Sequence, residues 1–218
     1  MRGIGQRGDH EPEVVAEVVG RLFEMARCRG GVAFEQGQAT RHLLGQTDLP
    51  ARVQCLLQRI DLGCRRARGV ELPEFAAFPL LDDDRGRALL RGYYDGYARI
   101  AARAGAGLLL ESPTWRANPD WGARVGYDAR ALDRINAEAM VFLRSIAEAW
   151  RERVADVLVA GMVGPRGDGY RASKATPDEA AAYHLPQIRA LARGGADLVA
   201  AYTLTGVAEA IGIALAAE

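Results

Sequence analysis

The chain has 218 residues, with 28 basic and 28 acidic side chains and therefore a formal net charge of zero. This length allows one domain of good size or two small ones. Without a net positive charge there is no electrostatic reason to expect nucleic acid or an anionic membrane as a partner. No apolar run approaches the roughly 20 residues needed to span a bilayer, so no membrane partner is expected.

The N-terminus and the cysteines bear on the cellular compartment. Residues 1–10 are polar and glycine-rich and lack the apolar core of a secretory signal, so we expect a cytoplasmic location. The cysteines are Cys28, Cys55 and Cys64, an odd number at wide spacing without a CxxC pair. This pattern indicates neither a disulfide framework nor a zinc knuckle.

The first part of the chain, residues 1–68, gives weak structural signals. Apolar residues at three- and four-residue spacing predict an amphipathic helix over residues 11–26. Residues 27–46 are rich in glycine, arginine and glutamine, and a short apolar stretch covers residues 53–60. We therefore treat residues 1–68 as an atypical N-terminal segment without recognisable chemistry.

The pattern becomes regular from Gly69 onward. Three aspartates, Asp82 to Asp84, suit a helix N-terminus, and the predicted helix ends at Gly105. A buried strand is predicted over residues 107–111. It is followed by a long helix over residues 129–153, with apolar residues at helical spacing.

Two more strand and helix pairs follow. A strand over residues 157–160 leads into a loop at 164–169, and Thr176 then opens a helix that ends at Gly194. A third strand covers residues 198–204, and a last helix starts near Val207. Three strand–loop–helix units in succession predict a parallel sheet. That pattern alone fits either a (β/α) barrel or a doubly wound sheet.

The loops after the strands carry a family resemblance. The segments LPEFAAFP at 72–79, ESPTWRANPDWGARVGY at 111–127 and GMVGPRGDGY at 161–170 resemble the homocysteine S-methyltransferase family, as does the spacing of the strands between them. The resemblance covers residues 69–218. It implies an α/β fold that is a partial TIM (β/α)8 barrel of roughly the first four β/α units, with reacting groups at the C-terminal ends of the strands.

The resemblance also implies a chemistry. Family members transfer a methyl group to the sulfur of homocysteine from a methylated sulfonium, ammonium or folate donor. The family binds zinc through three cysteines, and zinc lowers the pKa of the substrate thiol so that the thiolate forms at neutral pH. The expected partners are thus a small-molecule thiol and a methyl donor.

The chain departs from the family pattern in several places. The family's zinc ligands lie in an Asn-Cys segment and a Gly-Gly-Cys-Cys turn, and this chain contains neither. We therefore expect a truncated member that lacks the zinc site and is inactive alone. The alternative is a non-catalytic fragment or pseudoenzyme that associates with another chain. Three or four strands cannot close an eight-stranded barrel, so self-association through exposed sheet edges is expected.

Two further departures concern the first and fourth strands of the family. Its first strand carries Asp-Gly-Gly, where this chain has Asp61-Leu62-Gly63. The resemblance begins abruptly near Gly69. This leads to the hypothesis that residues 1–68 come from a shifted reading frame or a misplaced start, or that they form a disordered segment. Many members have Glu-Thr at the fourth strand, where Glu binds the substrate amine; here the pair is Tyr202-Thr203.

No catalytic residue or metal ligand is predicted in this chain. The candidate substrate-binding residues lie on the loops that follow the strands; they are Glu111, Thr114, Trp115, Asn118, Gly164, Arg166, Asp168 and Thr203. A tryptophan ring suits a sulfonium or ammonium group, although Trp115 and Trp121 equally suit a purely structural role in folding their loop. His184 has no second histidine or cysteine at metal-ligand spacing and is interpreted as a packed or solvated helix residue.

Overall fold

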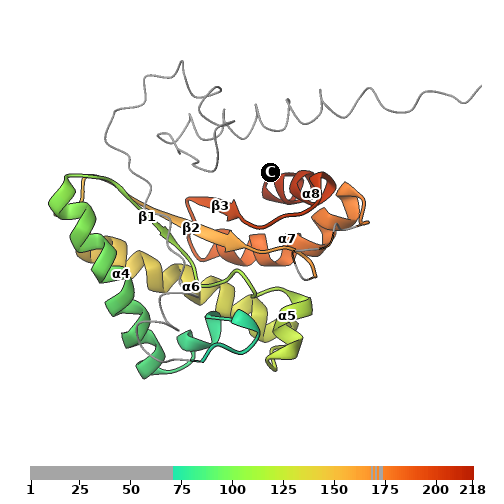
Figure 1. Ribbon diagram of the computed structural model, residues 1–218, viewed down its shortest axis with the longest axis horizontal. Coiled ribbons are helices and arrows are strands. Elements are labelled where there is room, and N and C mark those ends of the chain that lie inside the picture. The colour runs from blue at the N-terminus through green and yellow to red at the C-terminus, as the bar shows by residue number, and fades with distance from the viewer. Residues whose placement is uncertain (1–70, 168, 170, 172–173) are drawn as a thin grey trace, which may run out of the picture. The chain divides into compact units, whose positions relative to one another are not determined.

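The computed structural model describes residues 71–218 except 168, 170, 172 and 173 (Figure 1). Our predictions for residues 1–68, including the helix over 11–26, lie outside the described residues. The elements in chain order are η1 (Pro73–Phe75), η2 (Phe78–Leu81), α4 (Asp84–Ala104), β1 (Leu108–Glu111), α5 (Pro119–Arg124), α6 (Ala129–Trp150), β2 (Val157–Val163), α7 (Pro177–Arg193), β3 (Leu198–Ala201) and α8 (Val207–Ala217).

The three strands form a parallel sheet in the order β1-β2-β3. Each strand neighbours the next in the chain, as in a (β/α) barrel. The part of the prediction that is confirmed is an α/β fold with a parallel sheet. Of the four predicted β/α units, those of β1, β2 and β3 fall within the described residues. The first strand of the family would precede residue 71 and lies outside the described residues. The β/α unit that begins with it therefore stays a prediction.

The predicted strand boundaries were partly wrong. Strand β2 continues to Val163, beyond the predicted end at Ala160, because its first half pairs with β1 and its second half, from Ala160 on, pairs with β3. Strand β3 ends at Ala201 rather than residue 204. The backbone of Thr203 has a φ of 59°, which is incompatible with an extended strand.

The helix boundaries follow from capping residues. Asp83 accepts a hydrogen bond from the Gly86 backbone N–H at 2.7 Å, and α4 ends at Gly105 with a φ of 62°. Helix α7 has a complete capping box between Thr176 and Glu179. In it the Thr176 backbone N–H donates to the Glu179 carboxyl, which lowers the pKa of that carboxyl. These satisfied N–H groups explain why the predicted starts agree with the structure.

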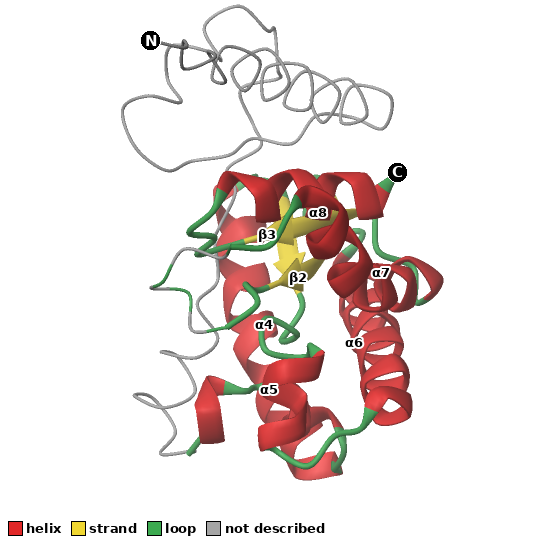
Figure 2. Cartoon of the chain, turned by 90° about the vertical axis from the view of Figure 1, so that its right-hand side faces the viewer, coloured by secondary structure: helices red, strands yellow, loops and turns green. Residues whose placement is uncertain are grey.

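The core lies between the sheet and its helices, with successive strand residues pointing to opposite faces. Leu108 and Leu110 of β1 join the main core with the helices, whereas Leu109 joins Ala160 and Ala200 in a small cluster on the other face. Figure 2 shows α6, α7 and α8 in succession along the sheet. The second face is the one that would line a barrel interior.

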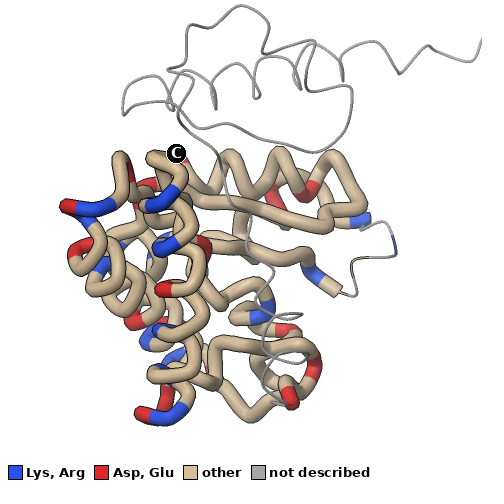
Figure 3. Tube along the Cα trace, turned by 60° about the vertical axis from the view of Figure 1, so that its left-hand side comes forward, with Lys and Arg blue, Asp and Glu red and all other residues tan. Residues whose placement is uncertain are grey.

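Charged side chains occupy the outer helices. Figure 3 shows acidic and basic residues interspersed along them. Arg134, for example, contacts Asp82 and Glu138 at 2.9 Å. Burial raises the pKa of Asp82, but hydrogen bonds from Tyr127 and Arg134 outweigh it and hold the pKa below its usual value. Within the part of the chain that the structure describes, no helix is long and apolar enough to cross a membrane.

Two glycines of α4 provide a matched test of how η2 packs against α4. A Cβ at Gly86 would lie 2.1 Å from the Leu80 carbonyl oxygen, whereas one at Gly96 would meet no atom within 4 Å. We expect Gly86→Ala to cost about 1–3 kcal/mol of unfolding free energy. Gly96→Ala should add about 0.5–1 kcal/mol, because alanine favours a helix interior. Chemical denaturation measures both; equal effects of the two changes would contradict the packing of η2 against α4.

Candidate functional site

Glu111 is the last residue of β1 and is only 1% exposed. By the alternation of strand residues, its side chain shares the face of Leu109 rather than the helix-covered face. Its Oε1 accepts a hydrogen bond from the hydroxyl of Tyr202, just beyond β3. The Tyr94 hydroxyl of α4 donates to its backbone carbonyl at 2.7 Å. A buried carboxylate and a phenol therefore meet where β1 and β3 end.

Thr114 links the loop after β1 to strand β2. Its hydroxyl donates to the Met162 carbonyl oxygen at 2.7 Å, and the Met162 N–H donates to Ser112 Oγ at 2.8 Å. The two hydroxyl oxygens, Ser112 Oγ and Thr114 Oγ1, lie 2.6 Å apart. Because the Thr114 hydroxyl donates its proton to the Met162 carbonyl, Ser112 is the donor between the two hydroxyls. These three hydrogen bonds form a closed circuit, in which the Thr114 hydroxyl donates its proton to a carbonyl of the protein itself.

Trp115 and Trp121 contact an arginine from the same loop. The Arg116 guanidinium lies 3.9 Å from the ring centroid of Trp115 and 3.5 Å from that of Trp121. Trp121 Nε1 donates to the Gly167 carbonyl at 2.7 Å. The attraction of an aromatic face for a cation is thus used by the chain's own arginine. This arrangement favours the structural interpretation of the two tryptophans over direct binding of a sulfonium.

Gly164 follows β2 and packs directly on the loop after β1. A Cβ at this position would lie 2.2 Å from the Trp115 carbonyl oxygen and 2.7 Å from Trp115 Nε1. The backbone at Gly164 therefore approaches Trp115 closely. Among the described residues, Trp115 Nε1 is buried without a hydrogen-bond partner.

Asn118 holds three segments together. Its Oδ1 accepts from the Trp121 backbone N–H at 3.2 Å, which caps α5, and from the Tyr183 hydroxyl of α7 at 3.1 Å. Its Nδ2 donates to the Pro165 carbonyl at 3.5 Å. Burial raises the pKa of Tyr183, so its hydroxyl stays protonated as a donor. Helix α5 itself was missed, although Asn118 followed by Pro119 is a recognisable helix start.

The remaining predicted residues lie nearer the rim. The Arg166 side chain is 48% exposed, with Nε 3.9 Å from Asp120 Oδ2. Thr203 is exposed, and its hydroxyl donates to the Tyr202 carbonyl at 2.6 Å. Asp168 lies outside the described residues. Glu111, Thr114, Asn118 and Gly164 are thus brought together at the carboxyl edge of the sheet, and Arg166 and Thr203 border it.

Sequence reasoning missed two buried polar pairs. The first is Tyr202 with Glu111. The second is His184 of α7 with Glu209 of α8, where His184 Nε2 lies 3.0 Å from Glu209 Oε1. His184 is fully buried, so its packed alternative holds and its solvated alternative is wrong. An acidic residue in a first helical turn, as Glu209 is, was the one available signal, and it does not reveal the partner.

The described residues do not fit a three-thiolate zinc site. All three cysteines precede residue 71 in the sequence. In the described range, no group of three or more histidine, cysteine, aspartate or glutamate side chains could hold a metal ion.

Comparison with known proteins gives the family. Residues 67–218 match the homocysteine S-methyltransferase family. This chain belongs to that family. Among curated proteins, none matches the chain.

Two solved structures show the same relationship. The metallated form of the homocysteine methyltransferase MmuM from Escherichia coli is 27% identical, with a TM-score of 0.57 over 78% of this chain and 58% of that one. The oxidized form is 25% identical, with a TM-score of 0.59 over 79% and 59% of the two chains. The chain thus spans less than two thirds of the length of these methyltransferases.

The circuit around Thr114 can be tested in this family member. Thr114→Val keeps the shape but removes the hydroxyl of this fully buried side chain, leaving the partly buried Met162 carbonyl without its donor. We expect a loss of about 1–3 kcal/mol of unfolding free energy, measured by denaturant titration. Thr114→Ser should restore most of it. Thr205→Val at an exposed position should cost less than about 0.5 kcal/mol, and an equal cost at both positions would contradict the circuit.

Proposed function

We propose that this chain supplies the front part of a barrel that transfers a methyl group to the thiol of homocysteine. The match of residues 67–218 to the homocysteine S-methyltransferase family carries the proposal. The parallel order β1-β2-β3 supports it, because it gathers the loops after the strands at the edge where barrel enzymes bind substrates. A methylated sulfonium, ammonium or folate compound is the proposed donor. A free thiol substrate requires a reducing compartment, which supports a cytoplasmic location.

Glu111 is the proposed contact for the substrate amine. Its carboxylate lies at the carboxyl end of β1 on the face away from the helices, with Tyr202 as a hydroxyl neighbour. A buried carboxylate beside a hydroxyl suits an ammonium group, which donates three hydrogen bonds. Tyr202 stands where many members carry the glutamate that binds the amine. In this chain, Glu111 would take over the negative charge.

The other predicted substrate residues divide into two proposed roles. Thr114, Trp115, Asn118 and Gly164 shape the loops through contacts within the protein, as their hydrogen bonds and packing support. Arg166, Asp168 and Thr203 are proposed rim contacts for the substrate or donor. Arg166 and Thr203 are exposed, so their side chains are available for such contacts.

The zinc expected for the family is proposed to be bound by ligands other than residues 1–218 of this chain. The described residues do not provide the ligands, so no step of the reaction is assigned to them through the metal. In the proposed division of labour, this chain orients the substrate and excludes water at the carboxyl edge.

A second proposal is a non-catalytic role in which the chain associates with another chain. Among the described strands, β1 and β3 each pair with β2 alone. A strand with one unpaired edge is a template for another strand. Both proposals therefore require contact with further strands, and they differ in whether methyl transfer results.

Complementation tests the enzymatic proposal. The full chain is mixed with the segment of a related methyltransferase that follows the region matched here, and methylation of homocysteine is followed with a methylsulfonium donor. We expect turnover in the mixture and none with either part alone. Glu111→Gln should lower the rate at least tenfold, because the carboxylate charge is lost, whereas Glu152→Gln at an exposed position should not.

The positive control is the same segment mixed with its own front part. Turnover in that control but not with this chain would favour the non-catalytic role. The zinc content of the purified chain alone is recorded alongside. About one tightly held zinc per chain would contradict the proposed origin of the ligands and would assign them to Cys28, Cys55 and Cys64.

A further inference from the structure

A buried histidine–carboxylate pair joins the two last helices. His184 in α7 is 0% exposed and Glu209 in the first turn of α8 is 2% exposed. Their Nε2 and Oε1 atoms are 3.0 Å apart. The helices pack closely here, since a Cβ at Gly212 of α8 would lie 2.5 Å from the Cβ of Ala180. The pair is therefore enclosed between α7 and α8.

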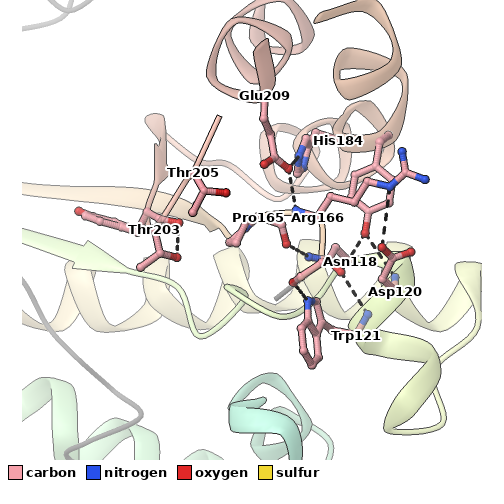
Figure 4. A network of polar contacts seen from close by, with 12 residues as sticks. Asn118, Asp120, Trp121, Pro165, Arg166, His184, Thr203, Thr205 and Glu209 are labelled. Carbon is pink, nitrogen blue, oxygen red and sulfur yellow. Dashed lines mark hydrogen bonds and ion pairs between the residues drawn. The ribbon is translucent and has the colours of Figure 1, made fainter. Parts of the chain in front are cut away.

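The same carboxylate oxygen also binds the loop after β2. Glu209 Oε1 accepts a hydrogen bond from the Arg166 backbone N–H at 2.6 Å (Figure 4). His184 Nε2, 3.0 Å from the same oxygen, is the second hydrogen-bond partner of Oε1. One oxygen atom thus connects α7, α8 and the segment that follows β2.

Stability alone does not account for this pair. Among the described residues, His184 Nδ1 and Glu209 Oε2 are buried without hydrogen-bond partners. Unsatisfied buried polar atoms destabilise a fold, and well-packed apolar side chains in place of a buried pair are often neutral or stabilising. A fold that needed only helix packing at this point would be served better by apolar residues.

The loop held by Glu209 contacts the loop after β1 through its next residue. The Gly167 carbonyl accepts from Trp121 Nε1 at 2.7 Å and from Arg116 at 3.2 Å. The preceding Pro165 carbonyl accepts from Asn118 at 3.5 Å. A shift of Arg166 would therefore move the acceptors of the loop that carries Trp115, Arg116 and Asn118.

We propose that Glu209, oriented by His184, is a positioning residue that sets the loop after β2 against the loop after β1. The carboxylate acts as a double hydrogen-bond acceptor at a fixed point of α8. These loops border the proposed substrate site, and only this consequence for substrate rests on the proposed function. The contact between the loops is a property of the chain without substrate.

The indole N–H signals of the ¹⁵N-labelled full chain test the proposal. The chain has three tryptophans, and Trp121 reports on the loop contact through its hydrogen bond to Gly167. In Glu209→Ala we expect the Trp121 signal to move and its proton to exchange faster with water. Trp150 is the internal control, because its indole donates to Asp95 of α4 at 2.7 Å. Its signal should stay unchanged.

Two further variants separate positioning from stability. Glu209→Gln keeps an oxygen that can accept both hydrogen bonds, so it should restore the Trp121 signal. The double variant His184→Leu with Glu209→Leu should retain or raise the melting temperature, yet keep the altered Trp121 signal. As a matched control, Thr176→Ala should lower the melting temperature by removing the α7 N-cap while leaving Trp121 unchanged.

The proposal is overturned if Trp121 in the double variant has the wild-type signal and exchange rate. The pair would then serve helix packing only. It is equally overturned if Thr176→Ala changes Trp121 as much as Glu209→Ala does. All measurements use the protein without substrate, so their outcome is independent of whether the chain takes part in methyl transfer.

Discussion

Parallel pairing in chain order is the constraint on which the described part of this protein depends. Strand β2 pairs with β1 through its first half and with β3 through its second half. The staggered pairing brings Glu111, Val163 and Ala201, the last residues of the strands, toward one edge of the sheet. Every residue of the candidate site lies at or after one of these ends, so a change in this register would disperse the site.

Polar contacts made by buried side chains join the loops at that edge. Ser112 and Thr114 use both polar groups of Met162, and Glu209 binds the Arg166 N–H. Such groups are costly when unpaired and directional when paired. They therefore fix the loops in one arrangement, which a site for a small substrate requires. Several residues that resemble ligand-binding groups in the sequence serve in this way as partners of one another.

Local signals in the sequence predicted the starts of the long helices. The helix starts at Asp84 and Pro177 follow from Asp83 and Thr176, whose side chains satisfy the first N–H groups of their helices. The end of β2 was not predictable from residues 157–163 alone, because the glycine at 161 resembles a loop start and its pairing partner lies 38 residues further along.

The site required information that periodicity does not contain. Tyr202 and Glu111 are 91 residues apart, and His184 and Glu209 are 25 apart. Their meeting depends on how the helices and strands pack, which no local pattern specifies. The arginine between Trp115 and Trp121 was likewise not foreseen, since stacking requires the turn into α5. The family resemblance, by contrast, rested on whole loop segments and was confirmed over residues 67–218.

We propose that the carboxyl edge of the sheet binds the thiol amino acid. Amide chemical shifts of the ¹⁵N-labelled chain, recorded during titration with homocysteine and in parallel with alanine, test it most directly. We expect homocysteine to shift amides around Glu111 and Tyr202 most strongly, and Glu111→Gln to weaken the response. Shifts centred on the outer helices instead, or equal responses to the two amino acids, would contradict it.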